Sequence, residues 1–155
     1  MRIIITLSLS LSLLMGLSAG ARFSDDKDGT ILDEGTGLIW QKCSRGLGPV
    51  DCSGEAVPEN WQQALKACKN LSLQGRSWRL PSINELKSIV DYSRIKPSIN
   101  TTFFPKTVQS LYWSSTSFVA DPSKAWYVDF TTGVVTVWSG IKTADIYYVR
   151  CVSGP

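Results

Sequence analysis

The side chains that most often carry out enzymatic chemistry are scarce in this 155-residue chain, which contains no histidine. Without imidazole, Cys–His and Ser–His–Asp nucleophiles and histidine-based zinc sites are excluded. A carboxylate pair such as Glu85 with Asp129 would suit glycoside hydrolysis. Nothing in the sequence brings these two residues together, and Glu85 has a structural role described below. We therefore predict a protein that is not an enzyme.

Charged side chains point instead to binding, because they are distributed unevenly. Residues 60–110 hold eight basic and two acidic side chains, whereas residues 22–59 hold four basic and eight acidic ones. A basic face attracts sulfated or phosphorylated polymers, although the same residues could form solvated helix faces. Our candidates for contacts with an anionic ligand are Arg76, Arg79 and Lys87. The basic stretch as a whole comprises Lys66, Lys69, Arg76, Arg79, Lys87, Arg94, Lys96 and Lys106.

Aromatic residues crowd the last third of the chain, where exposed rings could stack on sugars or bind proteins. Most are expected in the core. A hairpin turn at Thr131-Thr132-Gly133 would form a core face of three cross-strand pairs: Trp126 with Trp138, Val128 with Thr136, and Phe130 with Val134. Tyr127 and Asp129 would then point to the opposite face. They complete our set of candidate ligand contacts.

One acidic run resembles the start of a calcium loop. It contains Asp25, Asp26, Asp28 and Gly29. Aligning Gly29 with the loop glycine puts Ser24 at the first ligand position and Gly35 where a bidentate glutamate belongs. We therefore interpret the run as a turn and predict neither a metal nor another cofactor.

The N-terminus predicts export. Arg2, an apolar run and the small residues Ala19-Gly20-Ala21 form the pattern of a signal peptide over residues 1–21. We expect one domain over residues 22–155, located at the cell surface, outside the cell or in the periplasm, with no membrane span. Export disfavours nucleic acid as a partner. The oligomeric state is left open.

Four cysteines in an exported chain predict two disulfides, with three pairings possible on paper. Cys43 and Cys52 bracket a loop rich in glycine, while Cys68 and Cys151 lie on a helix and in a terminal strand. Local geometry favours Cys43–Cys52 and Cys68–Cys151.

Hydrophobic patterning predicts an α+β fold. The chain begins with a β-hairpin of residues 30–32 and 38–41. A helix follows Asn60, and a second follows Ser82, where Glu85 completes an S-x-x-E capping box. Around this second helix Trp78, Leu80, Leu86 and Ile89 are expected in the core. Four strand-like runs, LYWSSTS, AWYVDF, VVTVW and DIYYVRCV, then predict a C-terminal antiparallel sheet.

Several motifs occur together in an order that resembles the Lcl C-terminal domain family of bacterial collagen-like adhesins. They are DGTILDEGTGLIWQ, NWQQALKACKNLSLQGRSWRLPSINEL, YWSSTS, AWYVDFTTGVV and YYVRCVSG. The resemblance implies a C-type-lectin-like fold with a long bridge from the first helix to the last strand, in agreement with Cys68–Cys151. It also implies binding of sulfated polysaccharides. The chain contains no Gly-X-Y repeat, so trimerisation through a collagen-like stalk is not expected.

The sequence thus predicts an exported, non-enzymatic, adhesin-like module for an anionic or sulfated glycan or a surface or matrix partner. The alternatives are a structural or protein-interaction module and, less favoured, a carboxylate-based glycan hydrolase.

Overall fold

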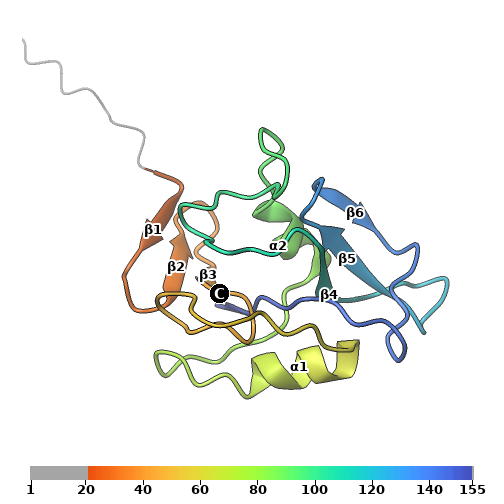
Figure 1. The fold of residues 1–155 in the computed structure, drawn as a ribbon. Helices are drawn as coiled ribbons and strands as arrows, with labels where there is room; N and C mark the ends of the chain where they lie inside the picture. Colours follow the sequence, from red (N-terminus) through yellow and green to blue (C-terminus); the bar gives the residue numbers. More distant parts are fainter. Residues whose placement is uncertain (1–20, 155) are drawn as a thin grey trace, which may run out of the picture.

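The computed structural model describes residues 21–154, so the predicted signal peptide lies outside the described residues except for Ala21. Two antiparallel sheets and two helices form the fold, and both disulfides are present as predicted, which confirms the α+β class (Figure 1). One sheet has the order β1-β2-β3-β7 and the other the order β4-β5-β6. The bounds are β1 Phe23–Asp25, β2 Thr30–Asp33, β3 Ile39–Gln41, α1 Trp61–Lys69, α2 Ile83–Ser88, β4 Leu111–Ser117, β5 Ala125–Asp129, β6 Val134–Thr136 and β7 Val152–Ser153.

Both helices begin at the capping boxes that the sequence predicts. The Asn60 side chain accepts from the Gln63 N–H at 2.9 Å, and Gln63 accepts in return from the Asn60 N–H. At α2 the same exchange joins Ser82 and Glu85. Each box satisfies backbone donors that have no partner inside the helix. The capping therefore sets where α1 and α2 start.

The N-terminal sheet contains the predicted hairpin, but the chain's last strand joins it rather than the C-terminal sheet. Strand β7 pairs with β3, with Trp40 opposite Val152. Earlier in the same apolar run, Tyr148 makes only an isolated bridge to Tyr112 of β4. The prediction of a fourth C-terminal strand was therefore wrong, because the run leaves β4 and crosses to the other sheet.

The register predicted for the β5–β6 hairpin was also wrong. Asp129 pairs with Val134 and Tyr127 with Thr136, one residue away from the predicted pairs. The Asp129 carbonyl accepts from the Gly133 N–H at 2.7 Å, and the Asp129 carboxylate accepts from the Thr131 N–H at 2.8 Å. These bonds close a four-residue loop. Relative to the predicted register, the shift of one residue moves the side chains of β6 to the opposite face of the sheet.

Two hydrophobic clusters cover the two sides of the β4-β5-β6 sheet. One lies between the sheets under α2 and includes Tyr112 and Val128. The other lies toward α1 and includes Trp113, Tyr127 and Tyr147. Strand β5 therefore packs on both sides: Ala125, Tyr127 and Val128 are buried, whereas Trp126 and Asp129 are half-buried. The predicted core residues Trp78, Leu80, Leu86 and Ile89 are all buried.

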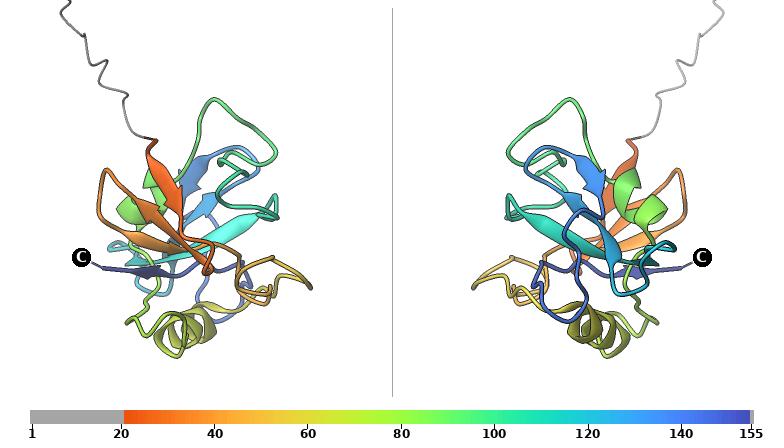
Figure 2. Two further views of the ribbon diagram at one scale, coloured as in Figure 1. Left: turned by 90° about the vertical axis from the view of Figure 1, so that its left-hand side faces the viewer. Right: turned by 90° about the vertical axis from the view of Figure 1, so that its right-hand side faces the viewer.

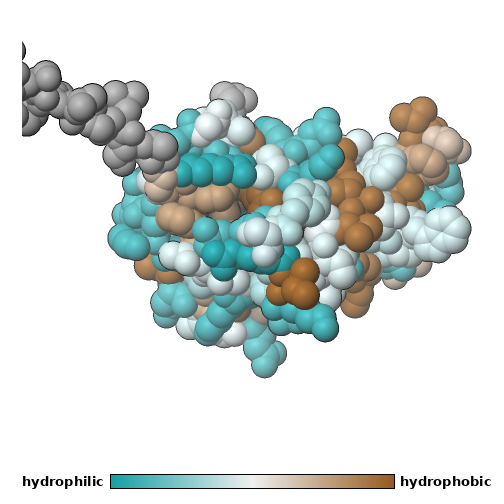
Figure 3. Space-filling view, turned by 90° about the horizontal axis from the view of Figure 1, so that it is seen from above, coloured by the Kyte–Doolittle hydropathy of each residue, from teal (hydrophilic) through white to brown (hydrophobic). Residues whose placement is uncertain are grey.

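Helix α1 lies along one side of the molecule, with the loop that follows β3 beside it in several views (Figures 1 and 2). On the opposite side, seen from above, separate apolar patches alternate with hydrophilic side chains (Figure 3). None of the helices in the described part of the chain has the length and apolar character needed to cross a membrane.

Candidate functional site: a groove beside α1

A groove of about 380 Å³ lies between α1 and the loop that contains the first disulfide. This volume is within the range of small-molecule binding sites. A smaller hollow of about 190 Å³, which shares Gln41, Arg45, Leu71 and Ser72 with the groove, continues along the loop toward Leu73. We call this concavity the α1 groove; its lining comprises Gln41, Arg45, Glu59, Gln63, Lys66, Ala67, Asn70, Leu71, Ser72 and Cys151.

The loop wall of the groove is held rigidly by the end of the chain. The Arg45 N–H donates to the Val149 carbonyl at 2.9 Å. Glu59 and Tyr147 exchange two backbone hydrogen bonds, and the Trp113 indole N–H donates to the Glu59 carbonyl at 2.8 Å. Because three bonds fix its backbone, Glu59 presents its carboxylate from a preorganised position.

The charges at the groove are only partly paired. Arg45 Nε lies 3.5 Å from Glu59 Oε1, and the Arg45 side chain is 46% exposed. The other carboxylate oxygen, Glu59 Oε2, is buried and has no hydrogen-bond partner within residues 21–154. Lys66, on α1, is exposed and adds a second cation to the lining. The groove therefore offers two cations against one carboxylate.

The floor of the groove is formed by buried polar and disulfide groups. Gln41 ends β3, and its Oε1 accepts from the Cys151 N–H at 3.2 Å. This bond leaves the Gln41 Nε2 group as the donor at the floor. Cys151 is bonded to Cys68 of α1, so the disulfide joins the floor to the helical wall.

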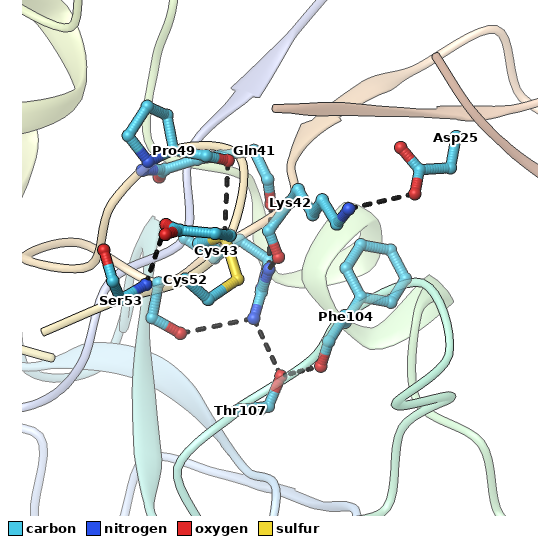
Figure 4. The surroundings of a disulfide bond; sticks show 12 residues. Asp25, Gln41, Lys42, Cys43, Pro49, Cys52, Ser53, Phe104 and Thr107 are labelled. Atoms are coloured by element: carbon cyan, nitrogen blue, oxygen red, sulfur yellow. Dashed lines mark hydrogen bonds and ion pairs between the residues drawn. A yellow bond between two sulfur atoms is a disulfide. The ribbon is translucent and has the colours of Figure 1, made fainter. Parts of the chain in front are cut away.

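A fully buried arginine supports this floor from below. Arg150 donates to the carbonyls of Gln41 and Lys42, to Ser44 Oγ at 3.2 Å and to Thr107 Oγ1 at 2.8 Å. Burial lowers the pKa of Arg150 to about 10, which leaves the guanidinium charged at neutral pH. Figure 4 shows the neighbouring Cys43–Cys52 disulfide, with Thr107 directed at the Phe104 carbonyl. The loop wall and β3 are thus tied to the C-terminal segment.

With this geometry established, comparison with known proteins identifies the family. A family model described as the Lcl C-terminal domain matches residues 29–153. The chain belongs to this family. No curated protein matches it. The match runs from before β2 to the end of β7 and includes both walls of the α1 groove. Membership supports, at a coarse level, an extracellular adhesin-like domain.

In this protein, Arg79 forms an ion pair with Glu85. Its two terminal nitrogens lie 2.8 and 2.7 Å from the Glu85 carboxylate oxygens. The hydrogen bonds from Arg79 lower the pKa of Glu85, against the opposing effect of burial. Arg76 and Lys87 are exposed, and neither lines the α1 groove. Their role as ligand contacts stays a prediction.

Tyr127 and Asp129 do not form the exposed pair that the sequence predicts. Tyr127 is only 4% exposed and packs against Trp113 and Tyr147, so its predicted exposure was wrong. Asp129 is partly buried and closes the β5–β6 loop through its carboxylate. Conversely Trp138, predicted in the core, is 87% exposed because β6 ends at Thr136 before reaching it.

The acidic run near the N-terminus is engaged by cations of the protein. Asp25 accepts from Lys27 Nζ at 2.8 Å and Lys42 Nζ at 3.0 Å. Burial raises the pKa of Asp25, but these hydrogen bonds outweigh it and lower the pKa to about 2. The Asp28 carboxylate accepts from the Thr30 N–H. Within the described chain no cluster of acidic, cysteine or histidine side chains has the arrangement of a metal site.

Most of the groove residues carry no signal in the sequence, although Lys66 belongs to the basic stretch. Arg45 and Glu59 lie in a loop with no periodic pattern, and Gln63 reads as a helix cap. One available signal was the pairing of Cys68 with Cys151, which places α1 against the chain end. It does not reveal that the loop around Arg45 lies beside α1.

Proposed function

We propose that the chain is an exported, adhesin-like binding module without enzymatic activity that holds an anionic glycan, such as a sulfated polysaccharide, in the α1 groove. The observation that carries this proposal is the lining of the groove. Arg45 and Lys66 supply positive charge, and Gln41, Gln63 and Asn70 supply amide groups. Amides and cations together suit the hydroxyl, carboxylate and sulfate groups of acidic sugars.

Family membership agrees with this proposal, since the Lcl C-terminal domain supports an adhesin-like role. The positive balance of the basic stretch adds long-range attraction for a polyanion. A C-type-lectin-like relationship stays part of the proposal. It is compatible with the disulfide that joins the first helix to the C-terminal segment.

We also propose that the protein is not an enzyme, because both candidate catalytic carboxylates have hydrogen-bond partners within the protein. Glu85 is bound by Arg79 and by the Ser82 N–H, and Asp129 accepts from the Thr131 N–H. A general acid or nucleophile needs an oxygen available to the substrate. Both carboxylates already have structural partners, which favours binding over hydrolysis.

Heparin binding to paired double variants tests the proposal. In Arg45→Ala/Lys66→Ala, affinity at low ionic strength should fall by about tenfold, because charged hydrogen-bond donors at the groove are lost. The control Arg76→Ala/Lys87→Ala removes the same charge outside the groove and should cost about threefold or less. Affinity should also fall as salt rises.

Two outcomes would contradict the proposal in different ways. Heparin binding that is absent at low salt, or that does not weaken as salt rises, rejects an anionic glycan ligand. A larger loss in Arg76→Ala/Lys87→Ala than in the groove variant moves the site to the face that the sequence analysis favoured.

A further inference from the structure

The α1 groove contains an acceptor that a purely anionic ligand cannot satisfy. Glu59 Oε2 is buried without a donor among the described residues, while the only ionic contact of Glu59 in the same part of the chain is the 3.5 Å approach of Arg45 to Oε1. A carboxylate oxygen removed from water and left unbonded destabilises the protein. A donor that is supplied on binding would relieve this cost.

We infer that the α1 groove recognises an acidic sugar through a free hydroxyl or amino group as well as through its acidic group, with Glu59 as the acceptor. The inference rests on the proposed function and specifies its ligand class. Sulfate and carboxylate groups offer only acceptors at neutral pH, whereas a hydroxyl or an ammonium group can donate to Glu59. The groove therefore distinguishes a sugar from a simple polyanion.

Arg45 connects the two parts of this recognition. Its side chain is 46% exposed, and its Nε lies 3.5 Å from Glu59 Oε1. Because the side chain is half exposed, its guanidinium can hold the acidic group of the sugar in a bidentate manner. With Arg45 holding the acidic group, a neighbouring hydroxyl or amino group of the same sugar donates to the Glu59 carboxylate, whose Oε2 has no donor among the described residues.

Gln41 completes the floor on which the sugar rests. The residue is 4% exposed, and its Oε1 is occupied by the Cys151 N–H. Its Nε2 group therefore donates a hydrogen bond to a sugar oxygen, while Glu59 accepts a hydrogen bond from a sugar hydroxyl or amino group. Because Gln41 and Glu59 are both anchored to the C-terminal segment, this donor and acceptor keep a fixed spacing.

The variant Glu59→Gln distinguishes hydrogen bonding of the sugar to Glu59 from attraction of the ligand by charge alone. The substitution keeps the shape, removes a negative charge and frees Arg45. If the groove reads only charge, affinity for every polyanion should rise. If Glu59 accepts from the sugar, affinity for a heparin-derived hexasaccharide should fall by about tenfold. Affinity for fully sulfated poly(vinyl sulfate), which has no free hydroxyl or amino group, should stay the same or rise.

The matched control is Glu55→Gln, which removes the same charge from an exposed position in the same loop outside the lining. It should leave both affinities unchanged or slightly higher, as measured by titration calorimetry at one ionic strength. If Glu59→Gln strengthens hexasaccharide binding as Glu55→Gln does, the inference is rejected and the proposed function survives. If neither probe binds the wild-type protein at low salt, both are rejected together.

Discussion

Two arginine–glutamate pairs in this protein use the same residue types in opposite ways. In the pair Arg79–Glu85, both carboxylate oxygens accept from the guanidinium, and Glu85 also accepts from the Ser82 N–H. In the pair Arg45–Glu59, one contact of 3.5 Å joins the side chains, and Glu59 Oε2 has no partner within residues 21–154. The first pair is saturated and the second is not.

The difference shows which pair has capacity left for a ligand. Bidentate pairing and helix capping use every oxygen of Glu85, so the pair stabilises the start of α2. The groove pair has an unused buried acceptor and a cation with available donors, which do little for stability. An arginine beside a glutamate is therefore structural or functional according to how completely the two satisfy each other.

The largest effect on stability should come from removing the Cys68–Cys151 disulfide, which lies close to both pairs. Cys68–Cys151 closes 83 residues, and its removal in Cys68→Ala/Cys151→Ala should lower the free energy of unfolding by about 4–5 kcal/mol. Arg79 pairs through its backbone with Val152, and Cys151 lines the groove, so both regions should loosen.

Urea denaturation of the oxidised protein measures this loss. Cys43→Ala/Cys52→Ala opens a separation of only 9 residues on the groove side and should cost about 2.5 kcal/mol. Equal losses in the two double variants would contradict the ranking by loop length. Hydrogen exchange should show that the backbone amides of Arg79 and its neighbours stay protected in Cys43→Ala/Cys52→Ala but lose protection in Cys68→Ala/Cys151→Ala.

Local signals in the sequence were sufficient for the capping role of Glu85 and for the burial around it, but not for its ion pair with Arg79. The S-x-x-E motif predicts that Ser82 and Glu85 cap α2, and the alternation of Trp78 and Leu80 predicts burial; the structure confirms both. For Arg79 the sequence predicts a ligand contact on a basic face, with a solvated helix face as the alternative. Its partner lies six residues away, but only the turn into α2 brings the two side chains together.

The groove pair and the hairpin faces depend on contacts between distant segments. Arg45 and Glu59 meet because their loop is held by Val149 and Tyr147, which no pattern around either residue indicates. The predicted hairpin puts Trp126, Val128 and Phe130 on the core face, so side-chain alternation places Tyr127 on the opposite face. The second cluster beneath α1 covers that face, and this coverage cannot be inferred from the alternation in β5 alone.

A smaller effect should appear in the pH dependence of the saturated pair. The pKa of Glu85 is lower in the folded protein than its ordinary value of 4.5, so the pair contributes fully above that pH. Its contribution is lost as the pH falls through the folded value. Glu85→Gln can keep the capping box but removes the ion pair, so it should cost about 0.5–1 kcal/mol at neutral pH.

The unfolding free energies of wild type and Glu85→Gln, followed by urea denaturation from pH 7 to strongly acidic solution, test this sign. The two curves should converge as Glu85 becomes protonated, because the wild-type residue then also lacks its charge. Curves that stay parallel through the acidic range would show that the charge of Glu85 does not contribute through Arg79.

The smallest effect on stability should come from the groove pair itself. Glu59→Gln breaks one long contact to a half-exposed arginine, and it also replaces a buried carboxylate that lacks a donor. These changes oppose each other, so the free energy of unfolding should change by about 0.5 kcal/mol or less. A loss as large as that of Glu85→Gln at neutral pH would show that Glu59 is structural. A near-zero change together with weaker hexasaccharide binding would establish that the unsatisfied acceptor is retained for a ligand.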